Sequence, residues 1–180
     1  MDIVSHGLWG GIAFGRKNKK EYAKALFFGV APDLFSFGIF FVASVLGIAS
    51  RPDFSAGPPD PSSIPSYVHT LYDITHSLVV FAIAFGLVWL IRKKPFIPML
   101  AWGLHIMIDI PTHSFDFFPT PFLWPLSDLG VDGIPWGREI IWYPNIALLV
   151  ALHLWLLVSR IKKRKNNSLS PDTAASENAD

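Results

Sequence analysis

The stretch ITHSLVVFAIAFGLVWLI, residues 74–91, decides the fold class, because its residues after Ser77 are almost all apolar. An amphipathic helix of a soluble bundle shows a polar face at the helical period, and residues 78–91 show almost none. About 20 apolar residues in helical conformation cross the hydrocarbon core of a bilayer. This stretch therefore predicts a membrane-spanning helix.

The rest of the chain has the composition of a membrane protein, with 51% hydrophobic and 16% charged residues. Further long apolar runs occupy Ala23–Ala49, Phe96–Pro111 and Ile140–Val158. The sequence thus predicts an all-α, polytopic membrane protein with about four transmembrane helices, its helical domain covering residues 1–160. Residues 1–15 are too short to cross and are expected to form a short or re-entrant N-terminal helix.

Short basic clusters border the apolar runs and predict the orientation. Lys and Arg are enriched in short cytoplasmic loops, so all the clusters are expected inside, together with the C-terminus. Basic runs beside apolar stretches are typical of membrane anchors, and no nucleic-acid partner is expected. Residues 161–180 are predicted to be a basic, then disordered, cytoplasmic tail. The clusters are Arg16–Lys20, Arg92–Lys94 and Arg160–Lys165, which leaves the loops Ser50–Asp73 and Ser114–Arg138 outside.

Two similar polar stretches interrupt this apolar sequence: HTLYDITHS at 69–77 and HIMIDIPTHS at 105–114. An ionisable side chain in a membrane segment is costly, and so it indicates a functional site. Counting about 1.5 Å per helical residue from the basic clusters puts the main candidates in the middle and outer part of a core about 30 Å thick, where they could meet. These candidates are His6, Asp33, His76, His105 and Asp109.

The candidates have the chemistry of a metal site. His105 and Asp109 are four residues apart and share a helix face, while Pro111 would let His113 turn back toward the same site. Pro32 similarly predicts a break or kink beside Asp33. Imidazole and carboxylate groups suit Zn²⁺ and other first-row divalent ions, and the chain has no cysteine for softer sites. We therefore predict one or two divalent ions, zinc before others.

Several of these residues also have ordinary structural interpretations. Any single histidine could hydrogen-bond a neighbouring helix, and His153, nearer the basic end, is expected to be a packing histidine. His69 and Asp73 are expected at the mouth of the site, where Asp73 could cap a helix that begins near Ile74. Thr75 and Thr112 could bond back to helix carbonyl groups.

The sequence resembles the membrane-bound metal-dependent hydrolase family, small proteins of the bacterial inner membrane, over roughly residues 3–130. More loosely it is similar to zinc-dependent phospholipase C and its nuclease relatives. The resemblance implies that His6, Asp33, His76, His105 and Asp109 are metal ligands. Many members have His-Arg shortly before Thr-His-Ser, where this chain has Tyr72-Asp73. The motifs that carry the resemblance are His6, Gly29-Val-Ala-Pro32-Asp33, Thr75-His76-Ser77 and His105-x-x-x-Asp109.

We expect a metal-dependent hydrolase that cleaves a lipid or other amphiphilic ester or phosphoester with metal-activated water. Asp33 or Asp73 would accept the proton of that water. A metal-ion or proton transporter, and a non-enzymatic membrane protein with a structural metal site, are the alternatives. Aromatic residues of the second outer loop would contact acyl chains or form an interfacial belt. They are Phe115, Phe117, Phe118, Phe122, Trp124 and Trp136.

Overall fold

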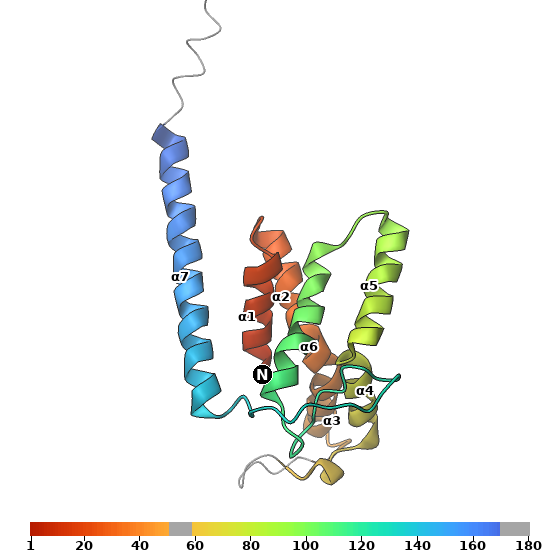
Figure 1. The fold of residues 1–180 in the computed structure, drawn as a ribbon. Coiled ribbons are helices and arrows are strands. Elements are labelled where there is room, and N and C mark those ends of the chain that lie inside the picture. The colour runs from red at the N-terminus through yellow and green to blue at the C-terminus, as the bar shows by residue number, and fades with distance from the viewer. Residues whose placement is uncertain (51–58, 170–180) are drawn as a thin grey trace, which may run out of the picture.

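The regular structure of the chain is α-helical, which confirms the predicted all-α class. The computed structural model describes residues 1–50 and 59–169, and these contain no β-strand. Figure 1 shows most of the helices side by side, with the longest of them along one edge. The helices are α1 (Ile3–Phe14), α2 (Lys19–Asp33), α3 (Ile39–Val45), α4 (Ser66–Thr75), α5 (Leu78–Arg92), α6 (Leu100–Thr112) and α7 (Glu139–Leu169).

The first two helices form a tight antiparallel pair, and α1 is the short N-terminal helix that the sequence predicts. Asp2 caps α1 by accepting a hydrogen bond from the Ser5 backbone N–H at 2.9 Å. Glycine allows the close approach, because a Cβ atom on Gly29 would lie 2.5 Å from the His6 carbonyl oxygen. Small residues permit such contact between membrane helices.

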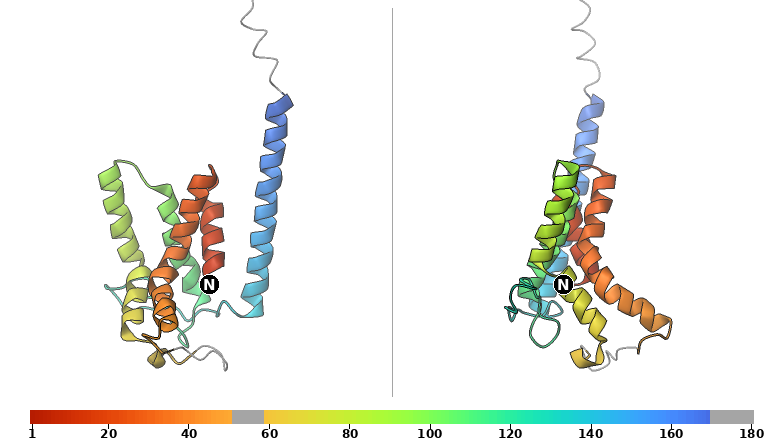
Figure 2. Two further views of the ribbon diagram at one scale, coloured as in Figure 1. Left: turned by 180° about the vertical axis from the view of Figure 1, so that it is seen from behind. Right: turned by 90° about the vertical axis from the view of Figure 1, so that its right-hand side faces the viewer.

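The kink predicted at Pro32 takes the form of a wide helical turn. Residues Leu34–Gly38 are π-helical and join α2 to α3 without a gap. Ser36 donates a hydrogen bond from its hydroxyl to the Pro32 carbonyl oxygen at 2.9 Å. The helix changes direction here, as the right-hand view of Figure 2 shows, and π-helical turns of this kind often occur at functional sites.

The chain between α3 and α5 differs from the prediction. The outer loop was expected to reach Asp73, but α4 already begins at Ser66, because Pro65 is favourable at a helix start. Asp73 therefore lies within a helix and does not cap one. Helices α4 and α5 meet at an angle of 57°, and Ser77 caps α5 with its hydroxyl oxygen, accepting from Val79 and Val80 N–H at 3.1 and 3.2 Å.

In the part of the chain that the structure describes, two helices are long and apolar enough to cross a membrane. They cover Lys19–Val45, with 27 residues, and Glu139–Lys163, with 25 residues, and the bent pair α4 and α5 would make a third span. The run Phe96–Pro111 forms a single 3-10 turn and the 13-residue α6, which is shorter than a bilayer core requires. Association with a membrane is thus supported, but the prediction of about four spans is not confirmed.

The three basic clusters lie at one end of the molecule (Figure 1). Arg16 and Lys20, from the turn between α1 and α2, line the same cavity as Arg160 and Lys163 of α7. Arg92, at the end of α5, stacks over the Phe96 ring at 4.8 Å. This common end agrees with the predicted alternation of the chain. Helix α7 continues through the basic residues to Leu169, and the rest of the tail that was expected to be disordered, residues 170–180, falls outside the described residues.

Helix α7 is attached to α1 by polar side chains. The Asn145 amide donates to the Ser5 hydroxyl at 2.8 Å, and its carbonyl oxygen accepts from Trp9 Nε1–H at 2.8 Å. His153, predicted to be a packing histidine, lies 2.7 Å from the Tyr22 hydroxyl through its Nε2 atom. Apolar side chains elsewhere on α7 are exposed, as lipid-facing residues would be.

Candidate metal centre

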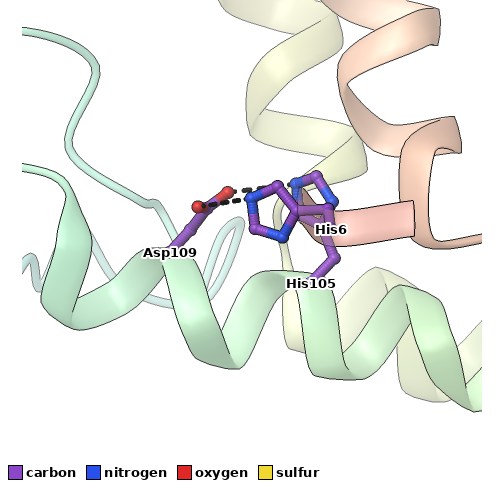
Figure 3. Close-up of side chains that lie close together, drawn as sticks. All are labelled: His6, His105 and Asp109. Atoms are coloured by element: carbon purple, nitrogen blue, oxygen red, sulfur yellow. Dashed lines mark hydrogen bonds and ion pairs between the residues drawn. The ribbon is translucent and has the colours of Figure 1, made fainter. Parts of the chain in front are cut away.

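Five ionisable side chains from four parts of the chain meet in the interior. Figure 3 shows three of them, with Asp109 pointing toward the two imidazole rings. They form two groups that share His105, and within each group the ligand atoms lie within 4.8 Å of one another. One group is His6, His105 and Asp109, and the other is Asp33, His76 and His105.

The first group contains the pair that was predicted on one helix face. His105 Nε2 lies 3.0 Å from Asp109 Oδ2, and His6 Nε2 lies 2.9 Å from Asp109 Oδ1. The rings of His6 and His105 are stacked with their centroids 3.6 Å apart. All three side chains are at most 1% exposed, so α1 and α6 bury their polar groups against each other.

The second group adds side chains from both bends in the chain. Asp33 stands where α2 passes into the π-helical turn, and His76 stands at the break between α4 and α5. His76 Nε2 lies 3.1 Å from His105 Nε2 and 3.4 Å from Asp33 Oδ1. The two breaks in helical geometry therefore direct one carboxylate and one imidazole toward α6.

The hydrogen bonds of the outer ring nitrogens fix how these imidazoles can bind. His105 Nδ1 lies 2.7 Å from the Gly29 carbonyl oxygen, and His76 Nδ1 lies 3.1 Å from the Tyr72 carbonyl oxygen. Carbonyl groups only accept, so each Nδ1 carries a proton, and in its neutral form each ring presents an Nε2 lone pair. Two such lone pairs 3.1 Å apart repel each other unless a proton or a metal ion lies between them. Metal-bound histidines are oriented by the same kind of bond.

The spacing and charge of the cluster also fit a divalent ion. Tetrahedral ligands at the usual zinc distance of about 2.0 Å are separated by about 3.3 Å, and the contacts here between a His Nε2 atom and an Asp oxygen range from 2.9 to 3.8 Å. Asp109 Oδ2 is buried without a hydrogen-bond partner. Among the described residues, no Lys or Arg forms an ion pair with Asp33 or Asp109, although the Met1 amino group contacts Asp109. The cluster could therefore bind a metal ion.

The remaining predicted site residues lie at different distances from this cluster. His113 follows the end of α6, and its Nε2 atom lies 3.4 Å from Asp109 Oδ1 with the side chain 12% exposed. It thus borders the cluster as expected. Asp73 lies in a separate cavity together with His69 and Asp128, and the structure does not bring it to the metal groups.

Two groups that orient the histidines of the site were not predicted from the sequence. The Gly29 carbonyl orients His105, and the Tyr72 ring stacks on His76 with centroids 3.8 Å apart. The Tyr72 hydroxyl donates to the Phe118 carbonyl oxygen at 3.1 Å, which fixes the ring. The small residues of α1, spaced to let a second helix approach, are the sequence signal that could have indicated Gly29. Tyr72 has no comparable signal.

Comparison with known proteins gives no family assignment. Neither the protein-family models, nor the curated proteins, nor the solved structures yield a match to this chain. The function must therefore be inferred from the metal centre and its surroundings.

Proposed function

We propose that the protein is a metal-dependent hydrolase of the membrane that acts on a lipid or another amphiphilic ester or phosphoester. The observation that supports this most is the sharing of His105 between two groups of potential ligands buried in an apolar helical domain. Each group offers three protein ligands, which would leave one position of a tetrahedral ion open for water. Catalytic zinc sites have such an open position, whereas structural sites are closed by four protein ligands. The motifs around these residues also support membership of the membrane-bound metal-dependent hydrolase family.

Nitrogen and oxygen donors without any cysteine favour zinc or another first-row divalent ion. His6, His105 and Asp109 would hold one ion, and Asp33, His76 and His105 would hold the same ion or a second one. Such an ion supplies a water of lowered pKa and polarises a carbonyl or phosphoryl oxygen.

Asp33 is the carboxylate best suited to accept the proton of that water. Its side chain is 16% exposed, whereas that of Asp109 is 1% exposed and is held between two imidazoles. A general base must reach the proton that it removes, so the more accessible carboxylate takes this role. Asp73, the other predicted base, lies in the separate cavity and is left out of the proposed reaction.

The substrate would enter from the loop that joins α6 to α7. A cavity of about 480 Å³ opens there, and His113 lies in its wall. Phe117 and Trp136 give this wall aromatic surface, and Arg138 adds a positive charge. An amphiphile suits such an entrance, because aromatic side chains favour the interface between headgroups and acyl chains.

We further propose a bacterial inner membrane location, with the basic end of the molecule in the cytoplasm and the metal centre toward the outside. The enrichment of Lys and Arg in cytoplasmic loops supports this orientation. A reporter fused after Asp180 should be active only if it is a cytoplasmic reporter. Activity of a periplasmic reporter at that position would reverse the orientation.

The function is tested on the full chain purified in a non-ionic detergent. We expect stoichiometric divalent metal in the wild-type protein and little in His105→Ala or Asp109→Ala, measured by elemental analysis. The wild-type protein should then hydrolyse phospholipid or phosphate-ester substrates, and a chelator should abolish the activity. Absence of stoichiometric metal would contradict the proposal.

Two further outcomes would decide for the alternatives. Metal without turnover of ester or phosphoester substrates would favour a structural site. Metal flux into liposomes that contain the protein would favour a transporter, and His105→Ala should then abolish the flux.

A further inference from the structure

A second cavity, of about 350 Å³, lies between α4 and the loop that joins α6 to α7. It is distinct from the entrance cavity at His113, and no residue lines both cavities. Its wall contains an unusual share of aromatic and acidic side chains. These are the aromatic residues Tyr72, Phe115, Phe118 and Trp124 and the acidic residues Asp73 and Asp128.

The charged groups of this cavity are acidic. Asp73 is half-buried and Asp128 is exposed, while no Lys or Arg is among the lining residues in the part of the chain that the structure describes. His69 also lines the cavity, and its Nε2–H donates to the carbonyl oxygen of Pro61, another residue of the same wall, at 3.0 Å. Two carboxylates without a Lys or Arg partner among these lining residues would stabilise a bound cation.

The aromatic rings are held in fixed positions. Tyr72 and Phe118 are 2% and 4% exposed, and their rings meet edge to face with centroids 5.1 Å apart. His69 stacks on Phe118 with centroids 4.6 Å apart. His76 covers one face of Tyr72 and His69 covers one face of Phe118, so these two rings offer little surface to a ligand.

The accessible aromatic surface of the cavity comes from Phe115, which is 58% exposed, and from the half-buried Trp124. Aromatic faces attract cations through the ring quadrupole, and several rings together recognise quaternary ammonium groups. Thr120 in the same wall has a buried hydroxyl oxygen without a hydrogen-bond partner.

We propose that this cavity binds an alkylammonium group, with a trimethylammonium group such as that of choline fitting it best. Methylated ammonium groups are weakly hydrated and need no hydrogen-bond acceptor for each proton, so aromatic rings and two carboxylates suffice. This site goes beyond the proposed hydrolase and does not depend on bound metal. Tyr72 connects the two sites, because its ring lines this cavity and also stacks on His76.

Choline binding to the wild-type protein in detergent provides the first test. Saturation-transfer NMR would follow the methyl resonance of choline and of its uncharged analogue, in which a tert-butyl group replaces the trimethylammonium group. We expect saturable choline binding and at least about tenfold weaker binding of the analogue, since shape is conserved and charge is not. Equal binding of the two compounds, or no saturable binding of choline, would overturn the proposal.

Substitution of the carboxylates provides the second test. The double variant Asp73→Asn with Asp128→Asn should weaken choline binding about tenfold or more, whereas Glu139→Gln, at an exposed position that lines neither cavity, should change it less than about twofold. Unchanged binding in a folded double variant would overturn the site. The comparison of choline with its analogue uses only the wild-type protein, so it remains decisive if the double variant fails to fold.

The source of the ammonium group is distinguished in nanodiscs. If phosphatidylcholine bilayers displace free choline and phosphatidylglycerol bilayers do not, the ligand is a lipid headgroup. If both bilayers leave choline binding unchanged, the ligand is a free amine. Neither result depends on metal or on hydrolysis, so failure of the proposed hydrolase would leave this site standing, and the reverse also holds.

Discussion

The segments 69–77 and 105–114 have nearly the same sequence pattern but send their residues to different places. In each, a His and an Asp four residues apart share one helix face, and a Thr-His pair closes the helix. The pair on α6 faces the metal centre, whereas the pair on α4 lines the acidic and aromatic cavity. The histidine that follows each helix behaves alike in the two segments: His76, after α4, lies at the metal centre, and His113, after α6, lies beside it.

This difference shows that spacing determines which residues share a face but not what the face contacts. His105 and Asp109 face α1 and α2, which approach closely through glycine. His69 and Asp73 face the loop that joins α6 to α7, where His69 stacks on the Phe118 ring with centroids 4.6 Å apart. The same motif is therefore a pair of potential metal ligands in one helix and part of a second cavity in the other.

Substitution of the first histidine of each segment should give the largest difference in metal affinity between the two segments. His105→Ala should lower metal affinity more than about 100-fold, because His105 belongs to both ligand groups and loss of even a supporting residue costs 10–100-fold. His69→Ala should leave affinity unchanged. Competition with a chromophoric chelator measures both values. A similar loss in the two variants would mean that both segments bind metal.

Substitution of the histidine that follows each helix, His76 or His113, should give a smaller difference in metal affinity. His76→Ala is expected to weaken metal binding about 10–100-fold, because its Nε2 atom is 3.1 Å from that of His105. His113→Ala should cost less than about tenfold, since His113 borders the cluster and its Nδ1–H donates to the Phe118 carbonyl oxygen. A larger loss of metal affinity in His113→Ala than in His76→Ala would mean that His113, at the end of α6, belongs to the ligand groups in place of His76.

The close contact of α1 with α2, which places the Gly29 carbonyl group beside His105, can be tested by substitution of Gly29. Gly29→Ala would place a Cβ atom 2.5 Å from the His6 carbonyl oxygen and so should destabilise the fold by about 1–3 kcal/mol and weaken metal binding. Gly86→Ala is the matched control, because nothing lies within 4 Å of its added Cβ atom. Thermal unfolding in detergent measures both. Equal stability of the two variants would show that α1 and α2 do not need this contact.

Substitution of Thr75 and of Thr112, the threonine before each of these histidines, should have similar effects on stability, the smallest of those predicted. Thr75 donates to the Leu71 carbonyl oxygen at 2.8 Å, and Thr112 donates to that of Ile108 at 2.9 Å, as the sequence predicted. Replacing either by Val should change stability by less than about 1 kcal/mol, since such bonds within a helix are weak. A large effect at Thr75 alone would indicate that its contact with His76 Nδ1 at 3.0 Å matters for the metal centre.

The parts of the structure that could be predicted follow from local rules. Helical period gave the shared face of His105 and Asp109, and proline chemistry gave the bend beside Asp33. The three basic clusters at one end agree with the alternation of apolar runs. Each of these needs only the residue types and their spacing along the chain.

The parts that could not be predicted depend on contacts between distant segments. The carbonyl group of Gly29 reaches His105 only because α2 packs against α6. Small residues indicate that helices approach closely, but they do not indicate which carbonyl group meets which ring. Asp73 was expected at the mouth of the site as a possible proton acceptor, but it lines a separate cavity, because the break at His76 separates its helix from the rest of the span. The number of spans depends in the same way on how short helices such as α6 pack.

The coordination of bound zinc tests the central claim most directly. X-ray absorption at the zinc edge of the loaded protein should show nitrogen and oxygen ligands at about 2.0–2.1 Å with scattering from more than one imidazole, and no sulfur. His105→Ala should lose this imidazole signal. A spectrum of fully hydrated zinc in the wild-type protein would contradict the metal centre.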